Sequence, residues 1–92
     1  MLGDSDLSGA NLYGANLSHA DLTRVDLSGA ILNGADLRES FLFQTDFTDA
    51  ILTGADISSS SSTSFWSLIW NNTICPDGTN SDDNGNTCEN NL

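Results

Sequence analysis

The sequence predicts an all-β fold, a four-sided parallel β-helix, and two features of its repeat predict it. Every fifth residue from Leu2 to Ile57 carries a large apolar side chain. A small side chain stands two places before almost every one of these residues. This period of five matches neither the period of about 3.6 of an α-helix nor the period of about 2 of a β-strand, so the chain must bury its apolar stripe by another winding.

Each unit of five residues is expected to form one short extended side and then a turn. Four such sides close a square, so that neighbouring coils of twenty residues pair their backbone groups at a spacing of about 4.8 Å. An α-helix is disfavoured because apolar positions five apart form no stripe on its surface. Glycine or a short polar residue at the fifth place permits the corner.

Residues twenty positions apart should stack, which predicts just under three coils and one core ladder on each face of the square. The predicted ladders are Leu2, Leu22 and Leu42 on the first face, Leu7, Leu27 and Phe47 on the second, Leu12, Leu32 and Leu52 on the third, and Leu17, Leu37 and Ile57 on the fourth.

The composition divides the chain into three parts. Residues 1–58 hold the repeat, residues 59–64 form a Ser-rich junction, and residues 65–92 are predicted to form a C-terminal cap with a disulfide loop. Five large apolar residues follow the junction, namely Phe65, Trp66, Leu68, Ile69 and Trp70. Since an open solenoid end exposes its core, we expect this cluster to cover the last coil. A dimerisation patch or a patch at a membrane edge is the alternative.

The tail holds the two cysteines of the chain, Cys75 and Cys88, around a polar loop rich in Gly, Asn and Asp. We expect them to form one disulfide, which for a loop of this size contributes about 3 kcal/mol. A disulfide indicates an oxidising compartment, so an extracytoplasmic location is expected, in the periplasm, the thylakoid lumen or outside the cell. The N-terminus shows no signal peptide.

The chain is strongly acidic. Its 92 residues include 13 Asp and Glu against 2 Lys and Arg, which gives a net charge of -11. This charge argues against direct binding of nucleic acid or of an anionic membrane, and it favours a basic protein partner. No apolar run in the sequence approaches the roughly 20 residues that span a bilayer.

Two sets of outward residues are candidates for a partner surface. Asp6, Asp26 and Asp46 form a column of like charge on the second face, either a solvated column that the repeat imposes or an acidic rail for a cationic partner. Four apolar residues also occupy outward positions at which the repeat otherwise has polar residues. They are Ile31 and Ile51 on the third face, and Phe41 and Phe43 on the first. These are either patches for a partner or a second copy, or places that the C-terminal segment covers.

No motif of the chain predicts a catalytic, cofactor-binding or metal-binding site. His19 lacks the neighbouring Cys or second His that zinc would require. Positions on a solenoid surface offer no dry pocket for a nucleophile, so an enzyme is not expected. Asn80, Asp82 and Asn84 have the spacing that starts a calcium loop, but Asn91 stands where such a loop carries a bidentate Glu, and calcium binding stays open.

The repeat is clearest as A-N-L-Y-G at residues 10–14, A-N-L-S-H at 15–19, A-D-L-T-R at 20–24 and A-D-L-R-E at 35–39. This A-(D/N)-L-x-x motif resembles the pentapeptide-repeat family over about 57 of the 92 residues. The resemblance implies a right-handed quadrilateral β-helix, in agreement with the square coil expected from the spacing. The Cys-bearing tail resembles the tails of some extracytoplasmic cyanobacterial members.

These observations predict a non-enzymatic scaffold whose activity is the binding of an unidentified protein. An alternative, implied by resemblance to the gyrase-binding members of the family, is an acidic DNA mimic that binds a DNA-binding protein such as DNA gyrase. The uncapped N-terminal coil offers one further surface, on which a second copy of the chain would form a homodimer.

Overall fold

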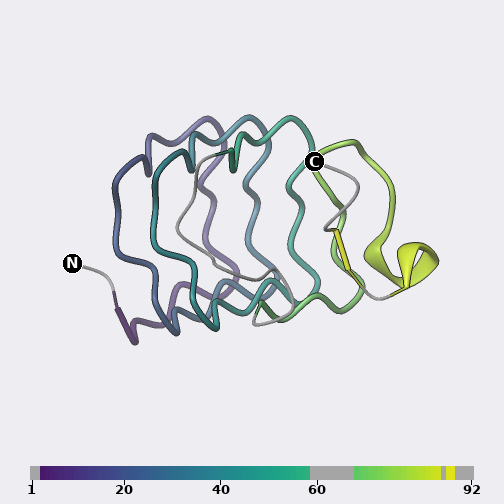
Figure 1. Ribbon diagram of the computed structural model, residues 1–92, viewed down its shortest axis with the longest axis horizontal. Helices are drawn as coiled ribbons and strands as arrows, with labels where there is room; N and C mark the ends of the chain where they lie inside the picture. Colours follow the sequence, from purple (N-terminus) through teal and green to yellow (C-terminus); the bar gives the residue numbers. More distant parts are fainter. Residues whose placement is uncertain (1–2, 59–67, 86, 89–92) are drawn as a thin grey trace.

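A computed structural model describes residues 3–58, 68–85, 87 and 88, and in it short chain sides wind into stacked coils (Figure 1). Parallel β-bridges join residues twenty positions apart, from the pair Asp6 and Asp26 to the pair Asp36 and Asp56. The bridging residues recur every five positions, so each coil has four sides. Each side contributes a single bridging residue, and η2 (Ser81–Asn84), a 3₁₀-helix, is the one named element in the described residues.

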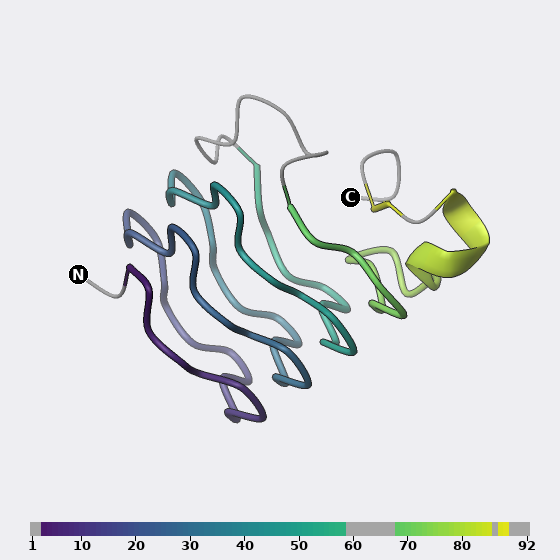
Figure 2. The same ribbon diagram turned by 90° about the horizontal axis from the view of Figure 1, so that it is seen from below.

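Backbone hydrogen bonds join neighbouring coils at the core residues. The N–H of Leu12 donates to the C=O of Ile31 at 2.7 Å, and the N–H of Leu32 donates to the C=O of Ile51 at 2.8 Å. Figure 2 shows the coils side by side, with η2 at the end far from the N-terminus. These hydrogen bonds between coils satisfy backbone groups that would be costly to bury without partners.

A tight turn closes each side of the square. The N–H of Ala10 donates to the C=O of Leu7 at 3.0 Å, and Gly9 between them has a φ of 70°. A turn with positive φ at its third residue favours glycine. Other residues nevertheless adopt positive φ at the equivalent corners, namely Asp4, His19, Arg24, Glu39, Gln44, Asp49 and Asn72.

The ladder residues fill the interior of the coils. Those of the middle coils are completely buried, namely Leu22, Leu27, Leu32, Leu37, Leu42, Phe47 and Leu52, and Ile57 is nearly so. Leu7, Leu12 and Leu17 pack against this core but are only partly buried, since they lie in the first coil. The large aliphatic side chains therefore provide most of the apolar burial that stabilises the fold.

Two buried hydroxyl groups replace alanine at the small position of the repeat. Ser40 Oγ donates to the C=O of Leu37 at 2.7 Å, and Thr45 Oγ1 donates to the C=O of Leu22 at 2.8 Å. Both side chains are completely buried. Each hydroxyl thus has a hydrogen-bond partner, which offsets the cost of removing it from water.

The coil-to-coil pairing continues into the tail with a different spacing. Parallel bridges join Asp46 to Ile69 and Ile51 to Ile74, so the separation rises from twenty to twenty-three residues. The ring of Trp70 stacks on that of Phe47, with 5.2 Å between the ring centroids. The prediction of just under three coils counted the regular repeat alone, and the tail adds a further side to the second and third faces.

The tail residues divide between inward and outward positions. Leu68 and Trp70 are buried, whereas the side chain of Ile69 is 46% exposed. Grouping Ile69 with the capping side chains was therefore wrong, because it occupies the outward bridging position of its side. Phe65 and Trp66 of the predicted cap lie outside the described residues, as do the junction at residues 59–64 and Leu2 of the first ladder.

A disulfide joins the tail side of the third face to a later part of the tail. Cys75 follows the bridging residue Ile74, as Leu52 follows Ile51, and it is completely buried. Its disulfide partner is Cys88, with 5.4 Å between the Cα atoms. Ile74 also forms an antiparallel bridge to Asn80, whose side chain caps η2 by accepting a hydrogen bond from the N–H of Asp82. None of the helices in the described part of the chain has the length and hydropathy of a membrane span.

Candidate functional site

The outward acidic residues have a structural role within their own sides. Asp6 Oδ1 accepts hydrogen bonds from the N–H of Ser8 at 3.0 Å and from its hydroxyl at 2.6 Å. Such Asx turns fix the backbone after the core residue. Within the repeat, the carboxylates or amides that accept from the N–H two residues later are Asp6, Asn11, Asn16, Asp21, Asp26, Asp36, Asp46 and Asp56.

The predicted acidic column lies on the second face. Bridges join Asp6 to Asp26 and Asp26 to Asp46, so the three carboxylates stack along the coil axis. The hydrogen bonds from Ser8 lower the pKa of Asp6, since they stabilise its charged form. Because each of these carboxylates caps its own turn, the column has a structural cause besides any role in binding.

Both arginines of the chain form ion pairs with nearby carboxylates. Arg24 reaches Asp4 in the preceding coil, with 2.7 Å between Nε and Oδ1. Arg38 Nε and Nη2 hold the two oxygens of Asp36 at 2.9 and 2.7 Å. The hydrogen bonds of Arg38 lower the pKa of Asp36 to about 2. The surface therefore offers a partner many carboxylates and few unpaired positive charges.

The apolar candidates occupy positions at which the repeat otherwise places an Asx cap. Ile31 and Ile51 bridge to each other on the third face and are 37% and 36% exposed. Among the described residues, no side chain accepts a hydrogen bond from the N–H of Asn33 or Thr53, where an Asx cap would do so. These sides thus lack a local hydrogen bond and expose apolar surface.

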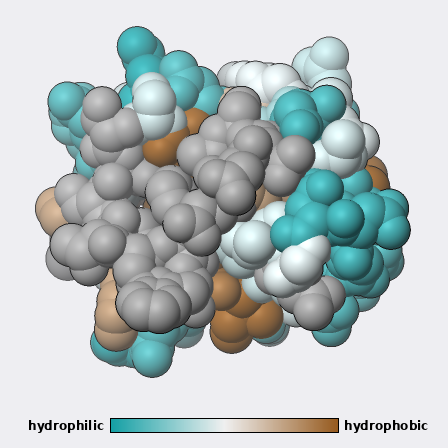
Figure 3. Space-filling view, turned by 45° about the vertical axis from the view of Figure 1, so that its right-hand side comes forward, coloured by the Kyte–Doolittle hydropathy of each residue, from teal (hydrophilic) through white to brown (hydrophobic). Residues whose placement is uncertain are grey.

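A second apolar pair lies on the first face, opposite the third. Phe41 and Phe43 flank the buried Leu42 and are 50% and 47% exposed. Among the residues that Figure 3 colours by hydropathy, apolar side chains lie at separate places between hydrophilic ones. The structure therefore leaves all four apolar candidate residues accessible.

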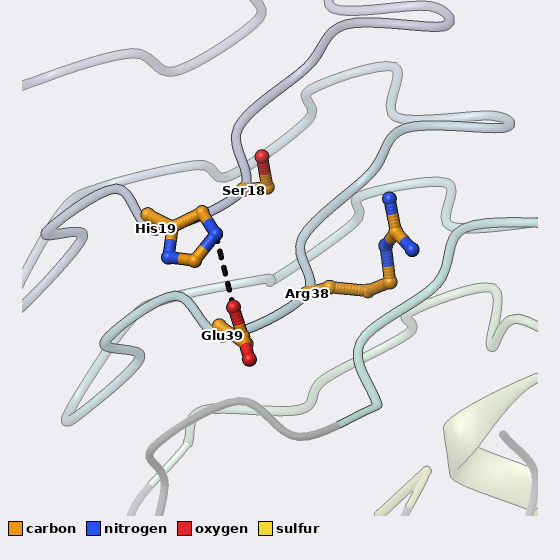
Figure 4. A pocket seen from close by; sticks show the side chains of 4 residues that line it. All are labelled: Ser18, His19, Arg38 and Glu39. Atoms are coloured by element: carbon orange, nitrogen blue, oxygen red, sulfur yellow. Dashed lines mark ion pairs between the residues drawn. The ribbon is translucent and has the colours of Figure 1, made fainter.

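Sequence reasoning missed a side-chain contact at one corner of the fourth face, between His19 and Glu39. His19 Nε2 lies 2.9 Å from Glu39 Oε2, and the two residues are twenty positions apart. Together with Ser18 and Arg38 they line a shallow surface hollow, in which Arg38 extends away from the pair (Figure 4). The stacking rule could have found this pair, since both residues hold the fifth place of their units.

The hollow brings together residue types that occur in hydrolases, but its hydrogen bonds follow another pattern. Ser18 Oγ donates to Asn16 Oδ1 at 2.6 Å rather than to His19. The side chains of His19 and Glu39 are 73% and 56% exposed. A nucleophile needs a base at its hydroxyl and protection from water, and this hollow supplies neither.

The residues that suggested a calcium loop serve the start and the packing of η2. Asn80 caps the helix, and Asn84 Nδ2 donates to Thr79 Oγ1 at 2.8 Å. Asp82 Oδ1 accepts from the N–H of Asn72 at 2.8 Å. In the part of the chain that the structure describes, no three His, Cys, Asp or Glu residues group as metal ligands do.

The repeat itself matches a known family model. The family model described as pentapeptide repeats (8 copies) matches the chain at residues 5–42 and 30–61. The chain belongs to the pentapeptide-repeat family. This membership confirms the resemblance drawn from the A-(D/N)-L-x-x motif, and it agrees with the bridges at intervals of twenty residues.

Solved pentapeptide-repeat structures have the same fold. A protein from the thylakoid lumen of Arabidopsis thaliana shares 34% identity over 88% of this chain and 55% of its own, with a TM-score of 0.71. HetL, which is involved in heterocyst differentiation regulation in the cyanobacterium Nostoc, shares 34% identity over 86% of this chain and 38% of its own, with a TM-score of 0.56. No curated protein matches the sequence.

These similarities imply a right-handed quadrilateral β-helix. The chain spans about half of the length of the thylakoid-lumen protein and less of HetL. Family membership gives the scaffold and leaves its biochemical role to be argued from the surface.

Proposed function

We propose that the protein is a non-enzymatic scaffold that binds another protein through its outer faces. The observation that carries this proposal is the set of exposed apolar residues at outward positions, Ile31 and Ile51 on one face and Phe41 and Phe43 on the other. An Asx cap at such a position contributes about 1 kcal/mol. The free protein loses this hydrogen bond where an apolar side chain replaces the cap, and a binding surface accounts for the apolar area that these side chains leave exposed.

The negative net charge of the protein favours a basic partner. The net charge of -11 raises the local concentration of cationic molecules and speeds their association. A protein with basic residues around an apolar contact would complement both features. Its binding should weaken as salt is added, because exposed charges are screened.

The test is affinity capture from extracts of the native host with matched variants. One variant carries Ile31→Asn and Ile51→Asn, and the other carries Phe41→Asn and Phe43→Ser. Each substitution introduces a residue that the repeat itself uses at that position, so both variants should fold. We expect a protein that one variant loses and the other retains. Identical capture by the wild type and both variants would contradict the proposal.

The acidic columns favour a second candidate function, a DNA mimic that binds a protein such as DNA gyrase. Asp6, Asp26 and Asp46 stack at coil spacing, as Asn16, Asp36 and Asp56 do on the fourth face. The assay is gyrase supercoiling in the presence of the purified protein. Inhibition by the wild type that is lost with Asp26→Asn and Asp46→Asn would support mimicry. Full supercoiling at saturating protein would exclude this candidate.

We further propose that the protein works in an extracytoplasmic compartment. The buried disulfide between Cys75 and Cys88 supports this location, since such bonds persist under oxidising conditions. The similar protein from the thylakoid lumen also supports an extracytoplasmic location. Fractionation of the host followed by thiol labelling tests it: the oxidised protein should be found outside the cytoplasm, and a reduced cytoplasmic pool would contradict the proposal.

A further inference from the structure

The first face combines two aromatic rings with a carboxylate. The bridge between Asp21 and Phe41 sets these two residues side by side in neighbouring coils. The N–H of Leu22 donates to the C=O of Phe41 at 2.8 Å, and the N–H of Arg24 donates to the C=O of Phe43 at 2.9 Å. The backbone therefore holds a group of outward side chains in one place, which we call the first-face patch. Its members are Asp21 and Thr23 in one coil and Phe41 and Phe43 in the next.

The two rings of the first-face patch flank the buried Leu42. Residues two positions apart on an extended side are separated by about 6.6 Å. A flat group that contacts one ring on each of its faces needs a separation of about 7 Å, since carbon atoms in contact lie about 3.5 Å apart. Phe41 and Phe43 are each about half exposed, so the protein does not enclose either ring. The spacing thus suits a planar group that enters between the rings.

The charge of the first-face patch favours a cation. Hydrogen bonds from Thr23 lower the pKa of Asp21, so this carboxylate is charged at neutral pH. Arg24 borders the patch, but its charge is paired with that of Asp4, with 2.7 Å between Nε and Oδ1. A cation that reaches the ring of Phe41 therefore meets a carboxylate in the neighbouring coil.

We propose that the first-face patch binds the guanidinium group of an arginine on the partner protein, with Phe41 and Phe43 against its two flat faces and Asp21 as its counter-ion. This inference rests on the proposed function, because it names the side chain by which a basic partner attaches to one of the apolar surfaces. Arginine fits better than lysine, since its guanidinium is planar, stacks on aromatic rings and is less strongly hydrated than an ammonium group. Arginine is also among the residues that most often dominate the binding energy of protein interfaces.

The third face lacks this combination. Ile31 and Ile51 offer apolar area without the negative face of an aromatic ring, which is the part of a ring that attracts a cation. The residues that bridge to them are Asn11, Ile74 and each other, so no carboxylate lies beside them in the neighbouring coils. The third face is therefore a control surface for the proposed site.

Titration with N-acetylarginine amide tests the site, with the ring protons of Phe41 and Phe43 followed by nuclear magnetic resonance. We expect saturable shifts of both rings in about 0.15 M salt, which screens weak attraction to the net negative charge. N-acetylcitrulline amide has nearly the same shape without the charge and should cause no saturable shift. N-acetyllysine amide has the same charge without the planar group and should bind about fivefold more weakly. Equal affinity for either of these two compounds, or no shift with the arginine compound, would overturn the inference.

Matched variants assign the binding to the first-face patch. Phe43→Leu keeps an apolar side chain without the ring and should weaken binding of N-acetylarginine amide about fivefold. Asp21→Asn removes the charge but can still cap its turn, as Asn11 does, and it should weaken binding by a similar factor. Ile51→Asn on the third face should leave the affinity unchanged. Wild-type affinity in both Phe43→Leu and Asp21→Asn would contradict the inference.

Affinity capture with the same variants separates this inference from the proposed function. Loss of a host protein with Phe43→Leu and with Asp21→Asn supports both. A host protein that is lost with the double variant Phe41→Asn and Phe43→Ser, but fully retained with Phe43→Leu and with Asp21→Asn, would leave the proposed function standing and overturn the inference. If N-acetylarginine amide binds as expected while no host protein depends on either apolar surface, the guanidinium site stands and the proposed function fails.

Discussion

The regular repeat and the tail bury apolar side chains by the same rule but with different residues. In residues 5–58, leucine fills the core, alanine or another small residue precedes it, and each unit pairs with the unit twenty positions later. In the tail, Trp70 and Cys75 take the core positions, and the pairing distance is twenty-three residues. The winding therefore depends on an inward side chain and a coil-to-coil hydrogen bond rather than on leucine.

The repeat and the tail are stabilised by different interactions. The repeat relies on its stacked neighbours and on the Asx cap of most sides. The tail adds a covalent bond between Cys75 and Cys88 and the buried hydroxyl of Thr73, which donates to the C=O of Phe47 at 2.6 Å. We therefore expect the repeat to unfold when core packing is lost, and the tail to unfold when the disulfide or the hydrogen bond of Thr73 is lost.

The largest effect is expected in the repeat. Leu32→Asp places an unpaired carboxylate at a completely buried position in the middle of its ladder, which should unfold the protein. The matched control is Ile31→Asp, one residue earlier and facing outward, which should fold. Far-ultraviolet circular dichroism measures both. A native spectrum for Leu32→Asp would show that this ladder is not essential to the fold.

The next effect is expected in the tail. The disulfide joins cysteines 13 positions apart. Its reduction should cost about 3 kcal/mol, which lowers the melting temperature by at least several degrees. Hydrogen exchange should locate the change, with faster exchange at Cys75 and the tail bridges than at Leu32. An unchanged melting temperature after reduction would mean that the coil contacts alone hold the tail.

A smaller effect is expected at the buried hydroxyl of Thr73 in the tail. Thr73→Val leaves the C=O of Phe47 without its side-chain donor and should destabilise the protein by about 1 to 3 kcal/mol. The control is Thr53→Val, because the Thr53 side chain is exposed and should contribute little. Urea unfolding measures the difference. Equal midpoints for the two variants would argue against a role for the buried hydroxyl.

The smallest effect concerns pH and belongs to the repeat. Arg38 lowers the pKa of Asp36 from 3.8 to about 2, so the folded chain holds this proton less tightly than the unfolded chain does. The pair therefore stabilises the fold above pH 3.8, and this contribution is lost as the pH falls toward about 2. Asp36→Asn should flatten the acid side of the stability profile across that range. A profile identical to that of the wild type would show that the exposed pair contributes nothing.

The sequence determined the regular part of the fold because its information is local and periodic. Once Leu12, Leu32 and Leu52 were assigned to one face by their spacing, the turn, the core and the outward positions of each unit followed. The same rule could have paired His19 with Glu39, which are also twenty residues apart. The structural role of Asp6 was not evident, since a column of carboxylates shows its charge in the sequence but not its hydrogen bonds.

Tertiary structure alone decided the register of the tail. The segment before Leu68 breaks the count of five, so periodicity no longer states which residue faces inward. Ile69 and Trp70 are both large and apolar, and their sequence neighbours do not distinguish an outward from an inward position. The choice follows from long-range contacts, the stacking of Trp70 on Phe47 and the hydrogen bond from the N–H of Phe47 to the C=O of Ile69. Contacts of this kind join parts of the chain that are far apart in the sequence, so the period of a local repeat does not predict them.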